Sequence, residues 1–366
     1  MTGMAGSFDV IVIGAGIAGM AVATELAADR SVLLLEQEEH PGSHSTGRSA
    51  ALLIPGYGGV TNAALARGSA AFFHNPPSDW DTPLLTRRGM LWLASEEHAG
   101  SLSADHLGSS PDARYVDGRD IHGLCPLLEN PNAWAALHDP EVWDIDVHAL
   151  QSGYLRRFRR FGGDLRIENR VADIARKNGD WHVSTPLATY LAPVIINASG
   201  AWADHIAGIA GLPPLGFEPR RRTVITFDAP ANTNISAMPC VCDVGESFYF
   251  KPESGRVLGS AADATLSAPM NAQPEEFDVA LTIDRMERVT GLQIRRITSK
   301  WAGLRTFSAD HAPVVGEDPR APGFVWLAGL GGAGIMTSPL LGRMLAEAVR
   351  SRGRLSPELG PERFLE

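Results

Sequence analysis

Residues 10–19 read VIVIGAGIAG, an apolar run that leads into three glycines spaced as G-x-G-x-x-G. In this pattern Gly14 permits a tight turn, Gly16 lets the backbone approach a diphosphate, and Gly19 lets the following helix pack closely on the sheet. Ala18 lies in the same turn. The free amide groups and the dipole at the start of a helix favour phosphate groups. The stretch therefore predicts a dinucleotide site between a strand and a helix.

The flanking sequence has the order of elements that such a turn requires. We expect a strand over Phe8–Ile13, a helix over Ile17–Ala28 because its apolar residues recur at helical spacing, and a second strand over Val32–Leu35. Glu36 ends the second strand, where a carboxylate can accept hydrogen bonds from a ribose, and Gln37 adjoins it. This acid disfavours NADP, whose 2′-phosphate would prefer arginine, and leaves NAD and FAD open.

The composition is that of a folded protein with room for two domains. Of 366 residues, 44% are hydrophobic and 20% charged, and the formal net charge is -10. The one basic run, residues 156–160, is typical of a solvated helix face, so nucleic acid is not an expected partner. Three cysteines cannot build a disulfide framework, and we find neither a signal peptide nor an apolar stretch of about 18 residues. We expect a cytoplasmic protein without a membrane span.

Later segments extend the predicted sheet and add a second one. Pro193–Ile196 and Phe324–Ala328 are short apolar runs typical of buried parallel strands, and Ile335–Arg350 has helical spacing. Thr223–Phe227 partly alternates, which favours a half-buried antiparallel strand. We therefore predict an α/β fold with a Rossmann-like nucleotide-binding domain and a second, mainly antiparallel β-sheet domain for substrate. The first would comprise residues 1–80, 145–215 and 300–366, and the second residues 81–144 and 216–299.

Several further motifs follow in order along nearly the whole chain. They include HSTGRSAA (44–51), ESFY (246–249), WAGLR (301–305) and GGAGIMTS (331–338). With VIGAGIAG, they make the sequence resemble the D-amino-acid oxidase (DAO) superfamily of FAD-dependent oxidoreductases, which includes glycine and sarcosine oxidases, and within it the bacterial D-arginine dehydrogenases. The resemblance implies FAD as the cofactor. No cysteine follows Cys242, so the C-terminal attachment of sarcosine oxidases is impossible and we expect noncovalent FAD.

The resemblance implies that two segments lie along the flavin. Small residues at 45–52 would let amide groups and hydroxyls approach the cofactor, and Arg48 would pair with a phosphate or a carbonyl group, or lie on the surface. The turn at 331–337 opens the last helix, whose dipole would stabilise a reduced flavin. The implied cofactor residues, besides those named above, are Ser45, Thr46, Gly47, Arg48, Ser49, Ala50, Ala51, Leu52, Val171, Gly331, Gly332, Ala333, Gly334, Ile335, Met336 and Thr337.

The resemblance also implies a site for the carboxylate of an amino acid. A planar guanidinium holds a carboxylate through two parallel hydrogen bonds. Arg222 and Arg305 match the residues that do this in the family, Tyr249 matches one that completes the contact, and Tyr57 one that lines the pocket. Arg222 is the last of three consecutive arginines, so a shift of one residue stays open. Either tyrosine could instead be an ordinary half-buried aromatic residue.

Departures from the D-arginine dehydrogenases concern the substrate side chain. Leu52 replaces a histidine, Ala333 replaces a tyrosine, and residues 88–90 contain no acid where those enzymes have a pocket glutamate. A cationic side chain would lack its partners here. We therefore expect a D-amino acid with a neutral or hydrophobic side chain, oxidised by hydride transfer from Cα to flavin N5. The imino acid would hydrolyse to a 2-oxo acid and ammonia.

Alternatives to this reaction remain open. A glycine- or sarcosine-type oxidase of secondary amines, a 2-hydroxy-acid dehydrogenase on the same fold, and a flavin-binding protein without turnover each fit the motifs. The electron acceptor could be oxygen or a quinone. Cys240 and Cys242 fall near the expected pocket wall, but two thiols without nearby histidines make a weak metal site, and we expect no metal.

Overall fold

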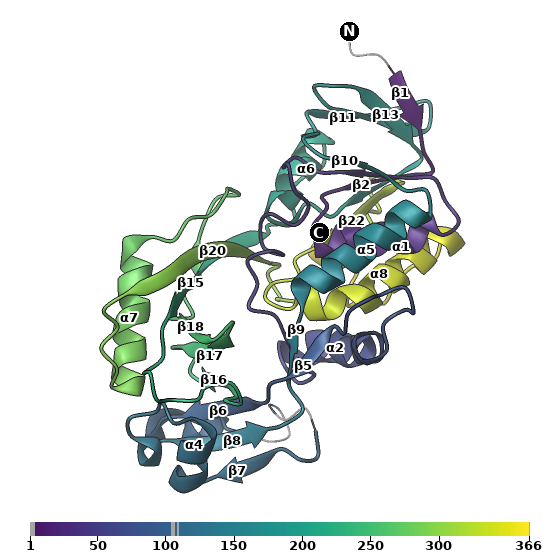
Figure 1. Ribbon diagram of the computed structural model, residues 1–366. Helices are drawn as coiled ribbons and strands as arrows, with labels where there is room; N and C mark the ends of the chain where they lie inside the picture. Colours follow the sequence, from purple (N-terminus) through teal and green to yellow (C-terminus); the bar gives the residue numbers. More distant parts are fainter. Residues whose placement is uncertain (1–3, 104–106, 108–109, 366) are drawn as a thin grey trace.

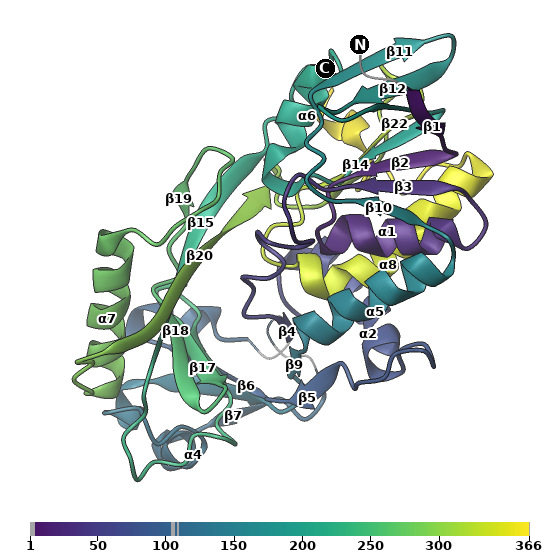
Figure 2. The same cartoon turned by 45° about the horizontal axis from the view of Figure 1, so that its top comes forward.

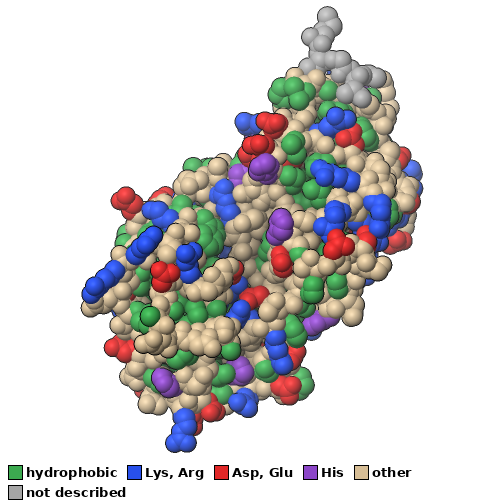
Figure 3. Space-filling model, in the orientation of Figure 1, with side chains coloured by type: hydrophobic (Ala, Val, Ile, Leu, Met, Phe, Trp, Pro, Cys, Tyr) green, Lys and Arg blue, Asp and Glu red, His purple; other side chains and the backbone are tan. Residues whose placement is uncertain are grey.

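The computed structural model describes residues 4–103, 107 and 110–365. Figure 1 shows two parts, one around a six-stranded sheet with α1, α5 and α8, and one around a nine-stranded sheet with α7. Within the described part of the chain, no helix has the length and apolar character needed to cross a bilayer. On the face drawn in Figure 3, lysine and arginine side chains are interspersed with aspartate and glutamate.

The six-stranded sheet has the predicted parallel core. Its order is β10 (Asp164–Arg166), β3 (Val32–Leu35), β2 (Val10–Ile13), β14 (Val194–Asn197), β22 (Phe324–Ala328) and β21 (Val314–Glu317). Every neighbouring pair is parallel except β21 with β22. The strands predicted near 10, 32, 194 and 324 are therefore confirmed, although β2 starts two residues later than expected and residues 4–7 form a separate strand.

Both faces of this sheet are covered, which explains why its strands are apolar throughout. Val10, Val12 and Leu34 pack against α1 (Ile17–Ala27), α5 (Val147–Arg160) and α8 (Gly334–Ser351). Ile11 and Leu33 face the opposite way, towards a four-stranded sheet and α6 (Ala203–Ile209). Figure 2 shows these two layers. The four-stranded sheet consists of β1 (Met4–Ser7), β13 (Thr189–Ala192), β12 (Asp180–Ser184) and β11 (Asp173–Lys177).

The nine-stranded sheet is antiparallel except where β16 pairs with β6. The predicted strand at 223–227 is the second half of its long strand β15. In order, the strands are β19 (Thr265–Leu266), β15 (Glu218–Phe227), β18 (Arg256–Ser260), β17 (Tyr249–Glu253), β16 (Cys240–Asp243), β6 (Met90–Ala94), β8 (Ala135–Asp139) and β7 (Arg114–Val116), with β20 (Ile297–Phe307) also paired to β15. Helices α7 (Glu276–Thr290) and α4 (Gly118–Leu124) contribute to the core against this sheet.

Strand β20 runs continuously through residue 300, where we placed a domain boundary. Residues 300–307 pair with β15 and so belong to the nine-stranded sheet. The strand leads from this sheet towards the glycine-rich turn before α8, and Phe307 forms an isolated bridge to Leu330. The division of the chain into two domains stays a prediction.

A small sheet and short helices complete the fold. The small sheet is formed by β4 (Leu52–Leu53), β9 (Trp143–Ile145) and β5 (Leu85–Arg87), and it lies between the two larger parts in Figure 1. Helix α2 (Gly59–His74) packs on α8. In the part of the chain that the structure describes, four 3-10 helices span Glu96–Ser101, Pro131–Ala133, Gly200–Trp202 and Pro361–Phe364. The chain thus has the α/β fold predicted from its sequence.

Candidate functional site

The glycines of the first turn fill the steric roles expected of them. Gly14 has φ +103°, and a Cβ there would lie 2.5 Å from the carbonyl oxygen of Ala198. A Cβ on Gly19 would lie 1.9 Å from the carbonyl oxygen of Gly14. Helix α1 starts at Ile17 with Gly16 as N-cap, which has no capping side chain, and the Ile17 amide donates a hydrogen bond to the Thr46 hydroxyl at 3.0 Å.

Glu36 lies at the end of β3 beside this turn. Its side chain is buried, and one carboxylate oxygen accepts a hydrogen bond from the Ala15 amide at 2.9 Å. The other accepts from the Glu38 amide at 3.0 Å. Burial raises the pKa of Glu36, and these amide groups oppose the rise. The carboxylate is thus fixed at the edge of the turn, within the cavity described next.

A cavity lies over the first turn, with about 1120 Å³ of empty space that includes part of the open solvent at its mouth. It runs from the ends of β2 and β3 to the turn before α8. Ten of the predicted cofactor residues line it: Gly14, Gly16, Ala18, Glu36, Gln37, Ser45, Thr46, Val171, Gly331 and Gly334.

A second cavity, with about 590 Å³ of empty space that likewise includes open solvent, adjoins the first and reaches the nine-stranded sheet. The two cavities share six residues in their walls and are therefore neighbours: Ile17, Ser45, Thr46, Leu304, Gly331 and Gly334. The second cavity is lined by the predicted cofactor residues Arg48, Ser49, Ala50, Gly332 and Ile335. It is also lined by three predicted substrate residues, Arg222, Tyr249 and Arg305.

The arginine register left open by the sequence follows from the alternation of side chains along β15. Arg221 points to α7, where its Nε donates to Asp278 at 3.1 Å. Arg222, on the opposite face, lines the second cavity. Its Nε donates to the Asp263 carbonyl oxygen at 2.5 Å. Burial, and next the positive charge of Arg305, lower the pKa of Arg222. No ion pair links Arg222 or Arg305 to a carboxylate within residues 4–103, 107 and 110–365.

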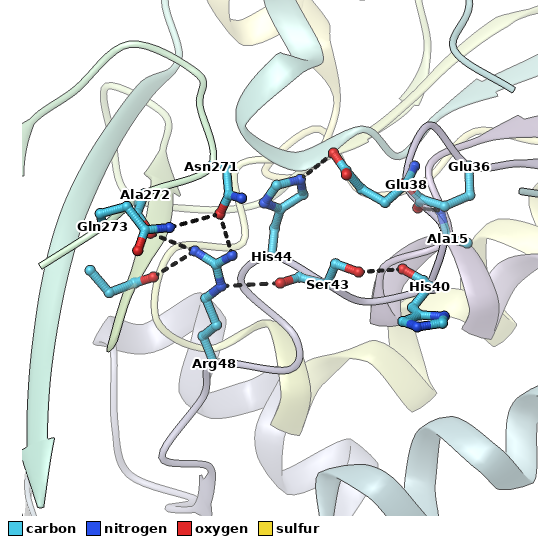
Figure 4. Close-up of polar contacts among 11 residues, drawn as sticks. Ala15, Glu36, Glu38, His40, Ser43, His44, Arg48, Asn271, Ala272 and Gln273 are labelled. Carbon is cyan, nitrogen blue, oxygen red and sulfur yellow. Dashed lines mark hydrogen bonds and ion pairs between the residues drawn. The ribbon is translucent and has the colours of Figure 1, made fainter. Parts of the chain in front are cut away.

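Arg48 bonds to protein acceptors through all three guanidinium nitrogens, as Figure 4 shows. Its Nε donates to the carbonyl oxygen of Ser43 at 3.0 Å, and Nη1 donates to those of Ala272 at 2.7 Å and Ala302 at 2.9 Å. Nη2 donates to the Asn271 side chain. These contacts are not those of a free surface residue, and the pairing of Arg48 with the cofactor stays a prediction.

Eight predicted residues line neither cavity. They are Gly19, Gly47, Ala51, Leu52, Tyr57, Ala333, Met336 and Thr337. Thr337 was expected to mark the flavin site, but its hydroxyl donates to the Ala333 carbonyl oxygen within α8. Leu52 pairs with Asp144 in the small sheet. Tyr57 is half-buried and packs on the hydrophobic core, close enough to Arg222 and Arg305 to affect the pKa of each.

The larger cavity also has walls that sequence reasoning missed. His44 lies within the quoted HSTGRSAA motif and could have been included on that ground. Trp202 and His205 follow β14, and Asn169 and Arg170 follow β10. These residues lie far apart in the sequence and carry no local signal for a nucleotide, because only the parallel sheet brings their loops to one edge.

The residues present fit a dinucleotide. Gly14 and Gly19 leave no room for side chains, a fixed carboxylate stands beside the turn, and the Nδ1 atom of His44 is buried with no hydrogen-bond partner in the described chain. A buried polar atom of this kind calls for a partner from a ligand.

Comparison with known proteins identifies the family. Residues 9–348 match the family model described as DAO, FAD dependent oxidoreductase. The chain belongs to this family. Its cofactor is FAD, and it is an FAD-dependent oxidoreductase.

Individual relatives are distant but cover most of the chain. Glycine oxidase of Geobacillus kaustophilus is 23% identical over 365 residues, 94% of this chain and 93% of that protein. Its crystal structure superposes with a TM-score of 0.83, at 23% identity and 96% coverage of each chain. L-proline dehydrogenase from P. horikoshii has a TM-score of 0.84, 20% identity, and coverage of 100% and 98%.

A third relative is much longer than this chain. Mouse mitochondrial dimethylglycine dehydrogenase is 25% identical over 385 residues, 93% of this chain but 42% of that protein. None of these three is a D-arginine dehydrogenase, so the finer resemblance drawn from the motifs stays a prediction.

The cysteines stand apart from the cofactor. None of the three lines either cavity. Burial raises the pKa of Cys125 and of Cys240 to about 12. Such thiols stay protonated and are poor nucleophiles. In the described part of the chain no group of three His, Cys, Asp or Glu side chains is arranged to hold a metal ion.

Proposed function

We propose that this enzyme oxidises an α-amino acid, and specifically a D-amino acid with a neutral or hydrophobic side chain, to an imino acid. Hydrolysis of the imino acid in water would give a 2-oxo acid and ammonia. Oxygen or a quinone is the expected final electron acceptor. The observation that carries the proposal is the pair of arginines, Arg222 and Arg305, which line one cavity and form no ion pair with a carboxylate of the described residues.

Two half-buried guanidinium groups in a shared cavity favour an anionic ligand. Two positive charges that lie close together repel each other, and a bound carboxylate would offset this repulsion. Tyr249 lies against Arg222, with the guanidinium carbon 5.9 Å from the ring centre. We infer that both arginines bind the substrate carboxylate and that Tyr249 holds Arg222 in place.

The remaining wall supports a substrate with an uncharged side chain. Val224, Leu304 and Ile335 supply apolar surface, and no aspartate or glutamate is among the described residues that line the second cavity. Arg88, in the segment that corresponds to the pocket glutamate of the D-arginine dehydrogenases, is already bonded to Asp144 through Nε at 2.6 Å. A cationic side chain would therefore be desolvated without a partner, which is costly.

The cofactor and the protein residues have separate roles in this reaction. When bound, FAD supplies the two-electron acceptor for the hydride that leaves the substrate Cα. The protein's own residues orient the substrate by its carboxylate, and the apolar walls limit access of water to the reacting carbon. The substrate amine must be unprotonated for hydride loss. A carboxylate beside the amine would stabilise its protonated form, and none is among the described residues that line the second cavity.

A second candidate is the oxidation of glycine or of a small amino acid whose amine is secondary, such as sarcosine. The names of two relatives favour it, since glycine oxidase and dimethylglycine dehydrogenase act on amino acids without a side chain. The same arginine pair would serve this reaction.

Anaerobic mixing of the holoenzyme with single substrates tests the proposal through bleaching of the flavin absorbance. The panel comprises both enantiomers of leucine, methionine, alanine and arginine, with glycine, sarcosine and D-lactate. We expect the fastest bleaching with a neutral D-amino acid. Preference for D-arginine, for an L-enantiomer or for D-lactate would refute the proposal, and preference for sarcosine or glycine would select the second candidate. Arg305→Met is the control, and it should slow the flavin bleaching because it removes a donor to the substrate carboxylate.

A further inference from the structure

Strand β15 has a gap in its pairing beside Arg222. Along one edge of this strand, β18 pairs with residues 225–227 and β19 pairs with residues 220–221. Between β18 and β19 the chain leaves the sheet over residues 261–264, and none of the described strands pairs with Thr223 along this edge. The gap therefore lies where β15 presents Arg222 to the second cavity.

Two side chains take the place of the missing strand. Both carboxylate oxygens of Asp263 accept a hydrogen bond from the Thr223 amide, at 2.8 and 3.0 Å. The Ser260 hydroxyl donates to the Thr223 carbonyl oxygen at 2.6 Å and accepts from the Ala262 amide at 3.1 Å. Buried backbone groups need such partners, so Asp263 and Ser260 allow the sheet to open at this point.

Helix α7 restrains the same turn from its other side. Ala262 has φ +52°, a left-handed conformation that a residue other than glycine keeps only where its neighbours enforce it. The Ala261 amide donates to the Thr282 hydroxyl at 3.2 Å, and Nη1 of Arg285 donates to the Ala261 carbonyl oxygen at 2.5 Å. The turn is therefore held in one conformation by both β15 and α7.

Asp263 contacts two consecutive residues of β15, one with each of its polar groups. Its carbonyl oxygen accepts from Nε of Arg222 at 2.5 Å, while its carboxylate accepts from the Thr223 amide. Burial raises the pKa of Asp263, and the Thr223 amide and the charge of Arg222 oppose the rise. Its negative charge acts on both Arg222 and Arg305, although it forms no ion pair with either among the described residues.

We propose that Asp263 is a positioning residue of the carboxylate site: its side chain closes the gap beside β15, and its carbonyl oxygen thereby holds Nε of Arg222 so that the two Nη atoms remain for the substrate carboxylate. Asp263 is not among the residues that line either cavity, so it acts through Arg222 and not by contact with the substrate. A guanidinium held at Nε has lost rotamer freedom before the ligand arrives, which favours two-point binding of a carboxylate.

The inference rests on one part of the function proposed above, the binding of a carboxylate by Arg222 and Arg305. It does not depend on the side chain or the configuration of the substrate. The experiment therefore uses benzoate, a carboxylate without an amine, so that binding is measured without turnover. Its dissociation constant is obtained from the change in flavin absorbance when the FAD holoenzyme is titrated at about pH 8, where ordinary carboxylic acids are ionised.

Two neutral substitutions separate the position of residue 263 from its charge. Asp263→Asn keeps an acceptor oxygen for the Thr223 amide and removes the charge, whereas Asp263→Ala removes both. We expect Asp263→Ala to bind benzoate about tenfold more weakly than Asp263→Asn, the effect expected for loss of one fixed hydrogen bond. Asp263→Asn should bind benzoate at least as tightly as the unmodified protein, because it keeps Arg222 in place and removes a negative charge near the anion.

The control is a second acid on an element that contacts the turn. Asp284→Asn removes an exposed carboxylate of α7, which is paired with Arg288, and should leave the dissociation constant unchanged. Equal affinity for benzoate in Asp263→Asn and Asp263→Ala would overturn the proposal.

The difference between the two variants should disappear when the arginine is removed. In an Arg222→Met background, Asp263→Asn and Asp263→Ala should give the same dissociation constant, because Asp263 acts only through that guanidinium. A tenfold difference that persists in this background would mean a general structural role and would overturn the proposal.

Ser260→Ala covers the case in which Asp263→Ala folds poorly. It loosens the same turn while keeping the charge of Asp263, so benzoate should bind about threefold more weakly, as expected for loss of a neutral hydrogen bond. This loss too should vanish in the Arg222→Met background. Unchanged binding in Ser260→Ala would then overturn the proposal.

Arg305→Met distinguishes failure of this inference from failure of the carboxylate site. If the unmodified holoenzyme does not bind benzoate, or if Arg305→Met binds it equally well, the carboxylate site fails and this inference fails with it. If Arg305→Met loses binding while both variants of Asp263 match the unmodified protein, only this inference fails.

Discussion

The guanidinium carbon of Arg222 lies 5.9 Å from the centre of the Tyr249 ring, and these residues come from two strands, β15 and β17, that are separated by β18. The ring restrains the guanidinium on one side, and the Asp263 carbonyl oxygen accepts from its Nε. No hydrogen bond joins the Nη atoms to another of the described residues, so they can bind a ligand. Because Arg305 lines the same cavity, the arrangement is suited to an anion.

The first prediction concerns this arginine pair. Arg222→Met and Arg305→Met each remove a charged hydrogen-bond donor, worth about 1.5–3 kcal/mol, so KM for the amino acid should rise about 10- to 100-fold. Bound FAD, measured from the flavin absorbance of the purified protein, should not change. Arg220→Met on the same strand is the control, because Arg220 lines neither cavity. An unchanged KM in both variants would exclude the carboxylate site.

Gly332 gives a steric test of the same site. A Cβ at this position would lie 3.2 Å from Nη1 of Arg305, tighter than ordinary van der Waals contact. The end of an arginine side chain can yield, so Gly332→Ala should displace the guanidinium without unfolding the protein. We expect KM to rise several-fold while the melting temperature changes little. Gly208→Ala, where a Cβ meets nothing within 4 Å, should leave KM unchanged.

Arg48 gives a prediction about local order. Its bonds join the segment at residue 43 to β20 and to the loop before α7. Arg48→Met should release that loop, raising amide hydrogen exchange at residues 267–275, while Asn271→Ala should have a smaller effect because it removes one bond. Arg256→Met, at an exposed ion pair, is the control. Equal exchange in all three variants would show that Arg48 does not anchor the loop.

Local patterns were enough to predict the elements around the first turn. The strands β2 and β3 and the helices α1 and α8 were expected because apolar spacing and glycine placement are properties of short segments. The partners of Arg48 were not predictable in this way, since Ala272 and Ala302 lie more than 200 residues away. The same holds for the cavity walls formed by Trp202 and Arg170, which depend on how loops meet at the sheet edge.

The three consecutive arginines show why a sequence pattern alone does not predict which side chain makes a given contact. Three consecutive arginines are equivalent in the sequence, and alternation along β15 tells only that the middle one faces away from the other two. The acids of α7 decide the outcome, because Asp278 binds Arg221 and so directs Arg222 to the cavity. Residues 278 and 221 are too far apart in sequence for any local pattern to connect them.

The last prediction concerns stability near the C-terminal end of the fold. Asp310 accepts hydrogen bonds from Arg363 Nε at 2.8 Å, the Ser308 hydroxyl at 2.9 Å and the Ala312 amide at 3.0 Å. Burial opposes the effect, but these bonds, led by that of Arg363, lower the pKa of Asp310 to about 2. A carboxyl whose pKa is lower in the folded protein than in the unfolded chain stabilises the fold above the unfolded value and loses this contribution as pH falls.

Asp310→Asn should therefore lower the free energy of unfolding near neutral pH, by no more than about 1 kcal/mol because the pair is partly exposed to solvent. The difference from the unmodified protein should be constant above about pH 5 and should shrink as the pH falls from about 4 towards 2. Urea unfolding at a series of pH values measures it. Asp228→Asn, at an exposed ion pair, is the control. A difference that grows on acidification would contradict the assignment, because the ionised form would then not be the stabilising one.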